Sequence, residues 1–206
     1  MEIRANATRM ELLRLKKRLN LARRGHKLLK DKLDELIRRF LELVHDYRQL
    51  RQQMEQAIAS AMQGLVLART LMSPEEIEET LIVPPGGVSL ESSRRSIMNI
   101  QVPQFELKME RQLFGYGLAS TSADLDTAFS LFAQALPMMI KLAEKEKTIQ
   151  LLAGEIERTR RRVNALEYVF IPNIEATLRR ISMRLGELER SNLVLLMRVK
   201  EIVRQH

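Results

Sequence analysis

Apolar residues recur at alternating steps of three and four between Leu12 and Ala61, and His26 is the one polar residue in this series. No proline and only two glycines, Gly25 and Gly64, fall within the first 72 residues. A heptad repeat this long predicts one helix that buries a single stripe of side chains against another helix. The predicted seam includes Leu12, Leu15, Leu19, Leu29, Leu33, Leu36 and Phe40.

A second stripe runs through the C-terminal part of the chain, from Ile149 to Ile202. It predicts another long helix, and the two helices are expected to bury their stripes against each other. The predicted seam of this helix includes Val163, Leu166, Phe170, Ile174, Leu178, Ile181, Leu185 and Leu188.

Pro172 interrupts the second stripe. The spacing there gains one residue relative to the heptad count, and a local departure from that period loosens a supercoil. The proline also removes the hydrogen bond that its N–H would donate to the carbonyl of Tyr168, at a cost of about 3 kcal/mol. Because the stripe resumes on the same face, we expect a continuous helix with a kink near Pro172. Pro137 predicts another kink or joint.

The middle of the chain has a different composition. Ser73 and Pro74, followed by acidic residues, predict the start of a short helix, and the prolines and glycines of residues 83–87 predict its end. Residues 88–103 contain two β-prone runs about a polar SSRRS turn, which predicts a hairpin. Residues 114–126 read as a loop that leads into a helix near Ser122.

These elements predict three parts: an N-terminal coiled-coil helix over residues 1–72, a middle module over 73–121 and a C-terminal coiled-coil helix over 122–206. The expected fold is all-α, a long antiparallel two-helix coiled coil in which the middle module reverses the chain. Both chain ends are then expected at one tip, with Leu12 close to Val199 or Ile202.

The composition argues against catalysis and metal binding. The chain has no cysteine, which excludes disulfides, thiolate metal sites and a cysteine nucleophile. His26 stands alone at a core position, where a polar residue more often fixes register than binds metal. Charges interrupt every apolar run, so neither a signal peptide nor a membrane span is expected. We therefore expect a cytoplasmic protein without cofactor or metal.

Charge is unevenly distributed along the chain. Residues 1–50 carry a net charge of +7, residues 51–140 carry −4 and residues 141–206 carry +5. The basic ends predict an acidic partner. Four arginines, Arg158, Arg160, Arg161 and Arg162, form the densest basic cluster, and no acidic residue lies between Glu157 and Glu167. They either form salt bridges with the partner helix or face something acidic outside it.

Two kinds of function fit this composition and charge distribution. A cytoplasmic coiled-coil scaffold would use the seam to dimerise with another chain. A basic coiled coil could bind nucleic acid through its backbone. Against nucleic-acid binding, Phe40, Tyr47 and Phe170 lie on the seam and are not free for base stacking.

Three long motifs resemble one known family, the D subunits of the V-type and archaeal-type rotary ATPases. They are TRMELLRLKKRL and RGHKLLKDKLDEL near the start and TRRRVNALEYVFIPNIEATLRRI near the end. The resemblance covers both long helices and is weaker in the middle, where VS and SIMNIQVP fit the family's hairpin. Ala7 stands where relatives often have proline, which affects only the expected start of the first helix.

The resemblance implies a non-catalytic central-stalk shaft that carries torque between ATP turnover and ion movement. Its coiled coil would enter a hexamer of A and B subunits, with the F subunit at its side and the funnel-like C subunit between its lower end and the membrane ring. The shaft would lie on the cytoplasmic side of the membrane without inserting into it. On this interpretation the arginine cluster contacts acidic loops of the hexamer, and the kink at Pro172 makes the shaft eccentric.

Overall fold

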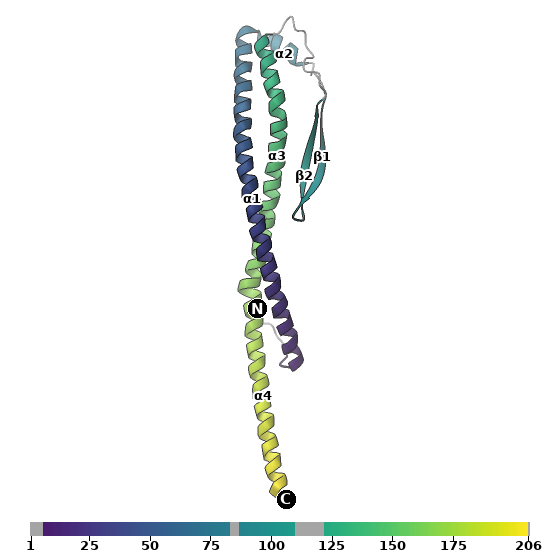
Figure 1. Cartoon of the computed structure of the whole chain (residues 1–206), viewed down its shortest axis with the longest axis vertical. Coiled ribbons are helices and arrows are strands. Elements are labelled where there is room, and N and C mark those ends of the chain that lie inside the picture. Colours follow the sequence, from purple (N-terminus) through teal and green to yellow (C-terminus); the bar gives the residue numbers. More distant parts are fainter. Residues whose placement is uncertain (1–5, 83–86, 110–121, 206) are drawn as a thin grey trace. The chain divides into compact units, whose positions relative to one another are not determined.

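A computed structural model describes residues 6–82, 87–109 and 122–205 of the chain. Its elements are α1 (Arg9–Leu71), α2 (Pro74–Ile82), β1 (Val88–Ile97), β2 (Ile100–Met109), α3 (Ala123–Asn164), the π-helical turn η1 (Ala165–Phe170) and α4 (Ile171–Gln205) (Figure 1). The predicted fold class, two long helical segments with a short helix and a β-hairpin between them, is confirmed.

The chain divides into two compact units. One consists of Met1–Glu35 with Ile156–His206, and the other is Leu36–Glu155. Each unit contains a pair of antiparallel helical segments, because both long helices pass from one unit into the other.

Two ion pairs indicate the helix register in the first unit. Arg9 Nη2 lies 2.5 Å from Glu189 Oε1, and Arg23 Nη2 lies 2.7 Å from Glu175 Oε1. The residue numbers in each pair add up to 198, as one antiparallel register requires. This register sets Leu12 near Leu185, so the predicted proximity of Leu12 to Val199 or Ile202 is wrong. The prediction failed because a heptad repeat fixes the buried face of a helix but not its lengthwise offset from its partner.

Small residues bring the helices of the second unit close together. A Cβ atom added at Gly64 would lie 3.2 Å from Ala128 Cβ, and Ala61, Ala68 and Ala135 are also buried. Larger side chains at these positions would push the two backbones apart. Farther along, Lys145 Nζ pairs with Asp46 Oδ2 at 3.0 Å.

The chain turns from α1 into α2 at a capping box. The Glu76 N–H donates to Ser73 Oγ at 3.3 Å, and the Ser73 N–H donates to Glu76 Oε2 at 2.9 Å. Below the cap, an apolar cluster of Ala68, Met72, Ile77 and Leu125, with Leu65 and Phe129 packed against it, joins α1, α2 and α3. The predicted helix start at Ser73 is confirmed.

The helix start predicted near Ser122 is also confirmed, since the Leu125 N–H donates to the Ser122 carbonyl at 3.0 Å. The stop predicted for the short helix at residues 83–87 lies outside the described residues, apart from Gly87. The predicted loop from residue 114 to Thr121 also lies outside them. Pro137 lies inside α3, which continues through it without interruption.

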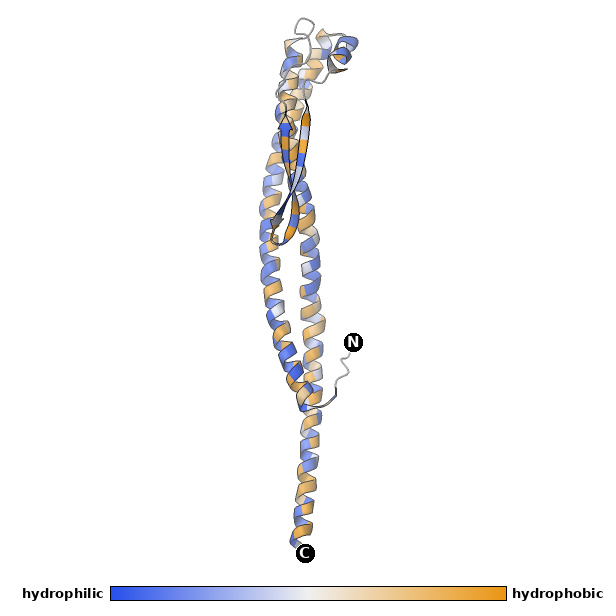
Figure 2. Ribbon diagram, turned by 90° about the vertical axis from the view of Figure 1, so that its right-hand side faces the viewer, coloured by the Kyte–Doolittle hydropathy of each residue, from blue (hydrophilic) through white to orange (hydrophobic). Residues whose placement is uncertain are grey.

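The β-hairpin is present, but its turn is not where the sequence predicted it. Strands β1 and β2 pair from Val88↔Met109 to Ile97↔Ile100, and the turn consists of Met98 (φ 50°) and Asn99 (φ 68°). Two positive φ angles in a two-residue loop are typical of a type I′ turn. The SSRRS run instead lies within β1, whose exposed surface accepts polar and charged side chains. Residues 91–96 of β1 are all hydrophilic, whereas hydrophobic and hydrophilic residues largely alternate along β2 (Figure 2).

Candidate functional site

The arginine cluster lies at the end of α3, in the first unit. Arg161 forms an ion pair with Glu157 one turn earlier, and Arg158 also makes an interaction within the chain. Arg160 and Arg162 are exposed and have no ion-pair partner among the described residues. Two of the four predicted contact residues are thus unneutralised charges on the helix surface.

Directly after the cluster, the backbone widens into the π-turn η1. The Ile171 N–H donates to the Leu166 carbonyl, five residues back, where an α-helix would use the residue four back. Pro172 follows and has no N–H to continue the α-helical bonding pattern. The π-turn therefore accommodates the extra residue in the stripe, and side-chain phase is recovered in α4.

Side chains of α1 hold this turn from within the same unit. His26 Nε2 lies 3.3 Å from Glu167 Oε2, and the Arg18 guanidinium carbon lies 5.6 Å from the centre of the Phe170 ring. A cation over an aromatic face contributes about 0.5–1 kcal/mol at an exposed site. His26 thus lies against a carboxylate of the turn, and both contacts tie α1 to the segment that precedes Pro172.

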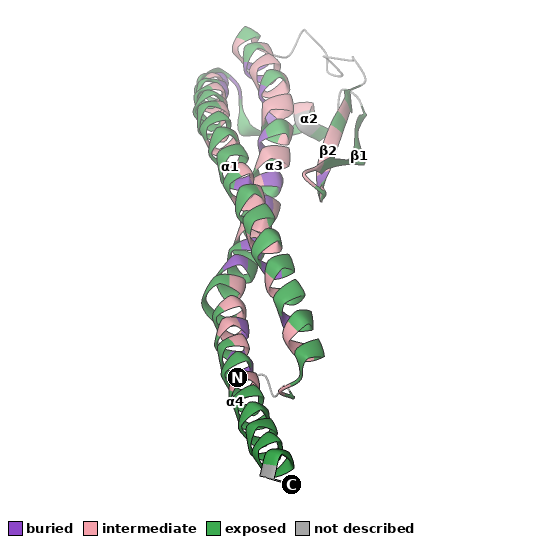
Figure 3. Ribbon diagram, turned by 60° about the horizontal axis from the view of Figure 1, so that its bottom comes forward, coloured by how far each residue is buried: buried purple, intermediate pink, exposed green. Residues whose placement is uncertain are grey.

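The predicted seam positions differ in burial (Figure 3). Most are half-buried, and Leu188 is exposed. Thr177, which the heptad count passed over in favour of Leu178, is buried one step of three after Ile174. The buried seam residues are Leu15, Leu36, Val163, Ile174 and Ile181.

Thr159 is a buried polar residue in the second stripe. Thr159 is 0% exposed, and its hydroxyl has no hydrogen-bond partner among the described residues. An unmade hydrogen bond at a buried site costs about 1–3 kcal/mol.

We expect Thr159→Val to raise the free energy of unfolding by about 1 kcal/mol in urea titrations. Thr177→Val is the matched control, because the Thr177 hydroxyl donates to the Asn173 carbonyl at 2.8 Å and its removal should bring no comparable gain. A destabilised Thr159→Val variant would contradict this account.

The last part of α4 exposes apolar side chains on all sides. Every residue from 190 to 204 is exposed, because the register that pairs Glu189 with Arg9 leaves this segment beyond the end of α1 (Figure 3). The heptad pattern predicted a seam there, and the structure places no described residue of α1 against it. The exposed apolar residues are Leu193, Val194, Leu195, Leu196, Met197, Val199, Ile202 and Val203.

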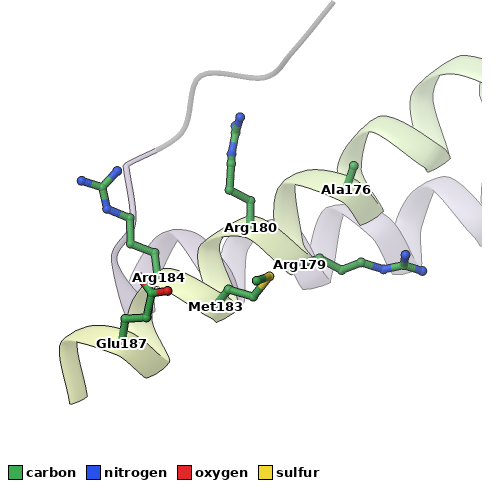
Figure 4. A pocket seen from close by; sticks show the side chains of 6 residues that line it. All are labelled: Ala176, Arg179, Arg180, Met183, Arg184 and Glu187. Atoms are coloured by element: carbon green, nitrogen blue, oxygen red, sulfur yellow. The ribbon is translucent and has the colours of Figure 1, made fainter. Parts of the chain in front are cut away.

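A hollow on the surface of α4 is open to solvent. The shallow hollow is lined by Ala176, Arg179, Arg180, Met183, Arg184 and Glu187, all from α4, and their side chains spread outward from that one helix (Figure 4). The described residues hold no cluster of three or more histidine or acidic side chains that could bind a metal ion. None of the described helices has the length and apolarity that crossing a membrane requires.

Comparison with known proteins gives a consistent result. A family model for the D subunit of ATP synthase matches residues 11–201. The chain is 50% identical to the V-type ATP synthase D subunit of Acetivibrio thermocellus over 205 residues, 98% of this chain and 92% of that protein. It is 50% identical to that of Thermoanaerobacter pseudethanolicus over 203 residues, 98% and 97% of the two chains. It is 49% identical to that of Clostridioides difficile over 201 residues, 96% and 90% of the two chains.

Proposed function

Because this chain belongs to the D-subunit family of ATP synthases, we propose that it is the central-stalk shaft of a V-type rotary ATPase. It carries torque between a catalytic hexamer of A and B subunits and the membrane ring that moves ions. The observation that carries the proposal is the family match, which runs through both long helices from residue 11 to residue 201. The shaft performs no chemistry itself; ATP is bound and hydrolysed by the hexamer.

The exposed end of α4 supports insertion into a cavity of that hexamer. A segment with this many exposed apolar side chains marks a surface that another protein covers. Residues 190–204 have no covering segment among the described residues, so the hexamer supplies the cover. A single helix has an asymmetric surface, and inside a ring of alternating subunits it contacts each catalytic site differently.

The arginine cluster is the second contact with the hexamer. Arg160 and Arg162 present charge outward, and acidic loops of the hexamer are their proposed partners. Exposed ion pairs contribute little individually, about 0–1 kcal/mol each. Weak and exchangeable contacts suit a shaft that must release each site in turn.

The π-turn and Pro172 give the shaft its shape in this proposal. A wide turn followed by a residue without an N–H is a recognised cause of helix bending. The bend sets the upper part of the shaft off the rotation axis, and the contacts of His26 and Arg18 hold it there.

The remaining partners follow from the same assignment. The F subunit binds the side of the coiled coil, and the funnel-like C subunit receives its lower end above the membrane ring. The chain is then a peripheral protein on the cytoplasmic side of the membrane.

Rotation is the test of the function. The chain, with a bead attached at a cysteine introduced in place of exposed Ser89, is combined with purified A and B subunits. We expect one chain to bind per hexamer, and the bead to turn in one direction when ATP is added. Ala123→Cys supplies a second exposed attachment site as a control for bead placement. ATP hydrolysis by a one-to-one complex with a stationary bead at both sites would rule out the shaft.

The arginines make a separate prediction. Changing Arg160, Arg161 and Arg162 to Gln should weaken hexamer binding by about tenfold at low salt, and should flatten its salt dependence, because screening acts on the lost attraction. The melting temperature should change little, since all three side chains are exposed. Arg69→Gln, an exposed arginine of the other unit, is the control. Early melting with unchanged salt dependence would assign the arginines to the fold instead.

A further inference from the structure

No described residue pairs with the outer edge of β1. All residues from Val88 to Ser96 are exposed. The hairpin has two strands only, so each strand has one edge that is not used by the other. A long uncovered edge offers backbone donors and acceptors to another extended chain.

Three observations agree on which backbone groups of β1 point outward. A two-residue turn makes Ile97 and Ile100 a hydrogen-bonded pair, and hydrogen-bonded and non-hydrogen-bonded pairs then alternate along the ladder. Pro103 therefore falls in a non-hydrogen-bonded pair, where a missing N–H costs no ladder bond. The Phe105 N–H, in the same phase, donates away from β1 to Glu144 Oε2 on α3. The residues of β1 in this phase are Val88, Leu90, Ser92, Arg94 and Ser96.

The edge of β2, in contrast, is already in use. The outward Phe105 N–H donates to Glu144 Oε2 at 3.2 Å, and the Val102 side chain, only 3% exposed, indicates that one face of β2 is covered as well. The hairpin thus has one edge against α3 and one that no described residue covers.

Side chains on β1 indicate the chemistry of an added strand. Val88 and Leu90 are 59% and 53% exposed, and Arg94 lies on the same face because side chains alternate along a strand. Glu91 is paired with Lys108, whereas Arg94 and Arg95 have no acidic partner among the described residues. An incoming segment would meet apolar surface at one end of β1 and two uncompensated positive charges at the other.

We propose that β1 binds an extended segment of another subunit of the assembly, which adds to the hairpin as a third strand. Its backbone pairs with the outward groups centred on Ser92. On the face shared by Leu90 and Arg94 it carries an apolar residue and, four positions along, an acidic residue that reaches Arg94. The partner is a neighbouring subunit only if the chain assembles as proposed above, so this inference rests on the proposed function.

Amide hydrogen exchange tests the added strand directly. Exchange is measured on the free chain and on its complex with purified A, B, C and F subunits. We expect the outward amides of Leu90, Ser92 and Arg94 to exchange at least tenfold more slowly in the complex. The inward amides of Ser93 and Arg95 bond to β2, so they report on the hairpin itself and should be protected in both samples.

Ser92→Pro removes one outward donor and leaves the ladder bonds in place, as Pro103 does in the natural β2. We expect this variant to keep protection at Ser93 and Arg95, to lose the added protection at Leu90 and Arg94, and to assemble about tenfold more weakly. Ser92→Ala is the matched control, since it keeps the N–H and should behave as the unmodified chain.

Each alternative result overturns the inference. Assembly without slower exchange at the outward amides would show that the edge of β1 binds nothing. Unchanged assembly of Ser92→Pro with its hairpin intact would show the same. Arg94 and Arg95 would then serve only to keep the exposed edge from aggregating. Protection that rises with concentration of the chain alone identifies a second copy as the occupant. A chain that joins none of the other subunits overturns the proposed function and this inference with it.

Discussion

Replacing Ile174 and Ile181 together by alanine is expected to lower the free energy of unfolding by about 6 kcal/mol. The two side chains are 0% and 2% exposed and lie two turns apart on α4, against α1 in the first unit. A buried isoleucine changed to alanine costs about 2–5 kcal/mol, from lost transfer energy and the cavity left behind. The change is measured by urea denaturation followed by circular dichroism.

The control uses the same helix and the same kinds of residue. Leu195→Ala with Ile202→Ala removes comparable side chains from the exposed end of α4 and should cost less than about 1 kcal/mol. If both double variants lose the same stability, the offset that places Glu189 against Arg9 is incorrect, and the end of α4 is packed after all.

Ending the chain at Arg190 is expected to leave the melting temperature nearly unchanged and to weaken binding to the hexamer by roughly a hundredfold. The deleted residues contribute no buried side chain to the described structure. Eight apolar residues would lose their cover, and even about 0.4 kcal/mol from each gives about 3 kcal/mol, since 1.4 kcal/mol corresponds to tenfold in affinity. Titration of fluorescently labelled chain with the hexamer measures the change.

A paired substitution in the full-length chain tests whether the charged residues of this segment contribute to binding. Lys200→Ala with Glu201→Ala keeps the helix, its net charge and its apolar residues, so affinity should stay within about threefold of the unmodified chain. Full affinity of the shortened chain would remove the end of α4 from the proposed interface.

Much of the fold was predictable because it depends on local patterns. The heptad stripes identified the long helices, and Ser73 with Glu76 identified the start of α2. The offset between α1 and α4 was not predictable, because Arg9 and Glu189 lie at opposite ends of the chain and many acidic residues could have paired with Arg9. The turn of the hairpin was missed because Met98 rarely adopts positive φ, so composition favoured the serines and arginines nearby.

The candidate site was predictable in part. The arginines stood out as a run without acidic neighbours, but only the structure distinguishes Arg161, paired with Glu157, from Arg160 and Arg162. The extra residue near Pro172 was visible in the spacing, whereas its form, a π-turn that begins seven residues before the proline, depends on backbone bonding. Thr177 was missed because the count followed apolar letters, and Leu178 is more apolar but less buried.

The π-turn also sets the angle between the arginine cluster and the buried face of α4. Each residue of an α-helix advances the side-chain direction by about 100°, and the wider turn over Ala165–Phe170 absorbs one extra residue. Deleting one residue there should therefore leave a regular α-helix in which the arginines keep their direction relative to Ile174 and Ile181. Inserting a further residue should instead turn the arginines by about 100°. In the proposed shaft, that insertion would point the arginines toward a different part of the hexamer while α4 keeps its place.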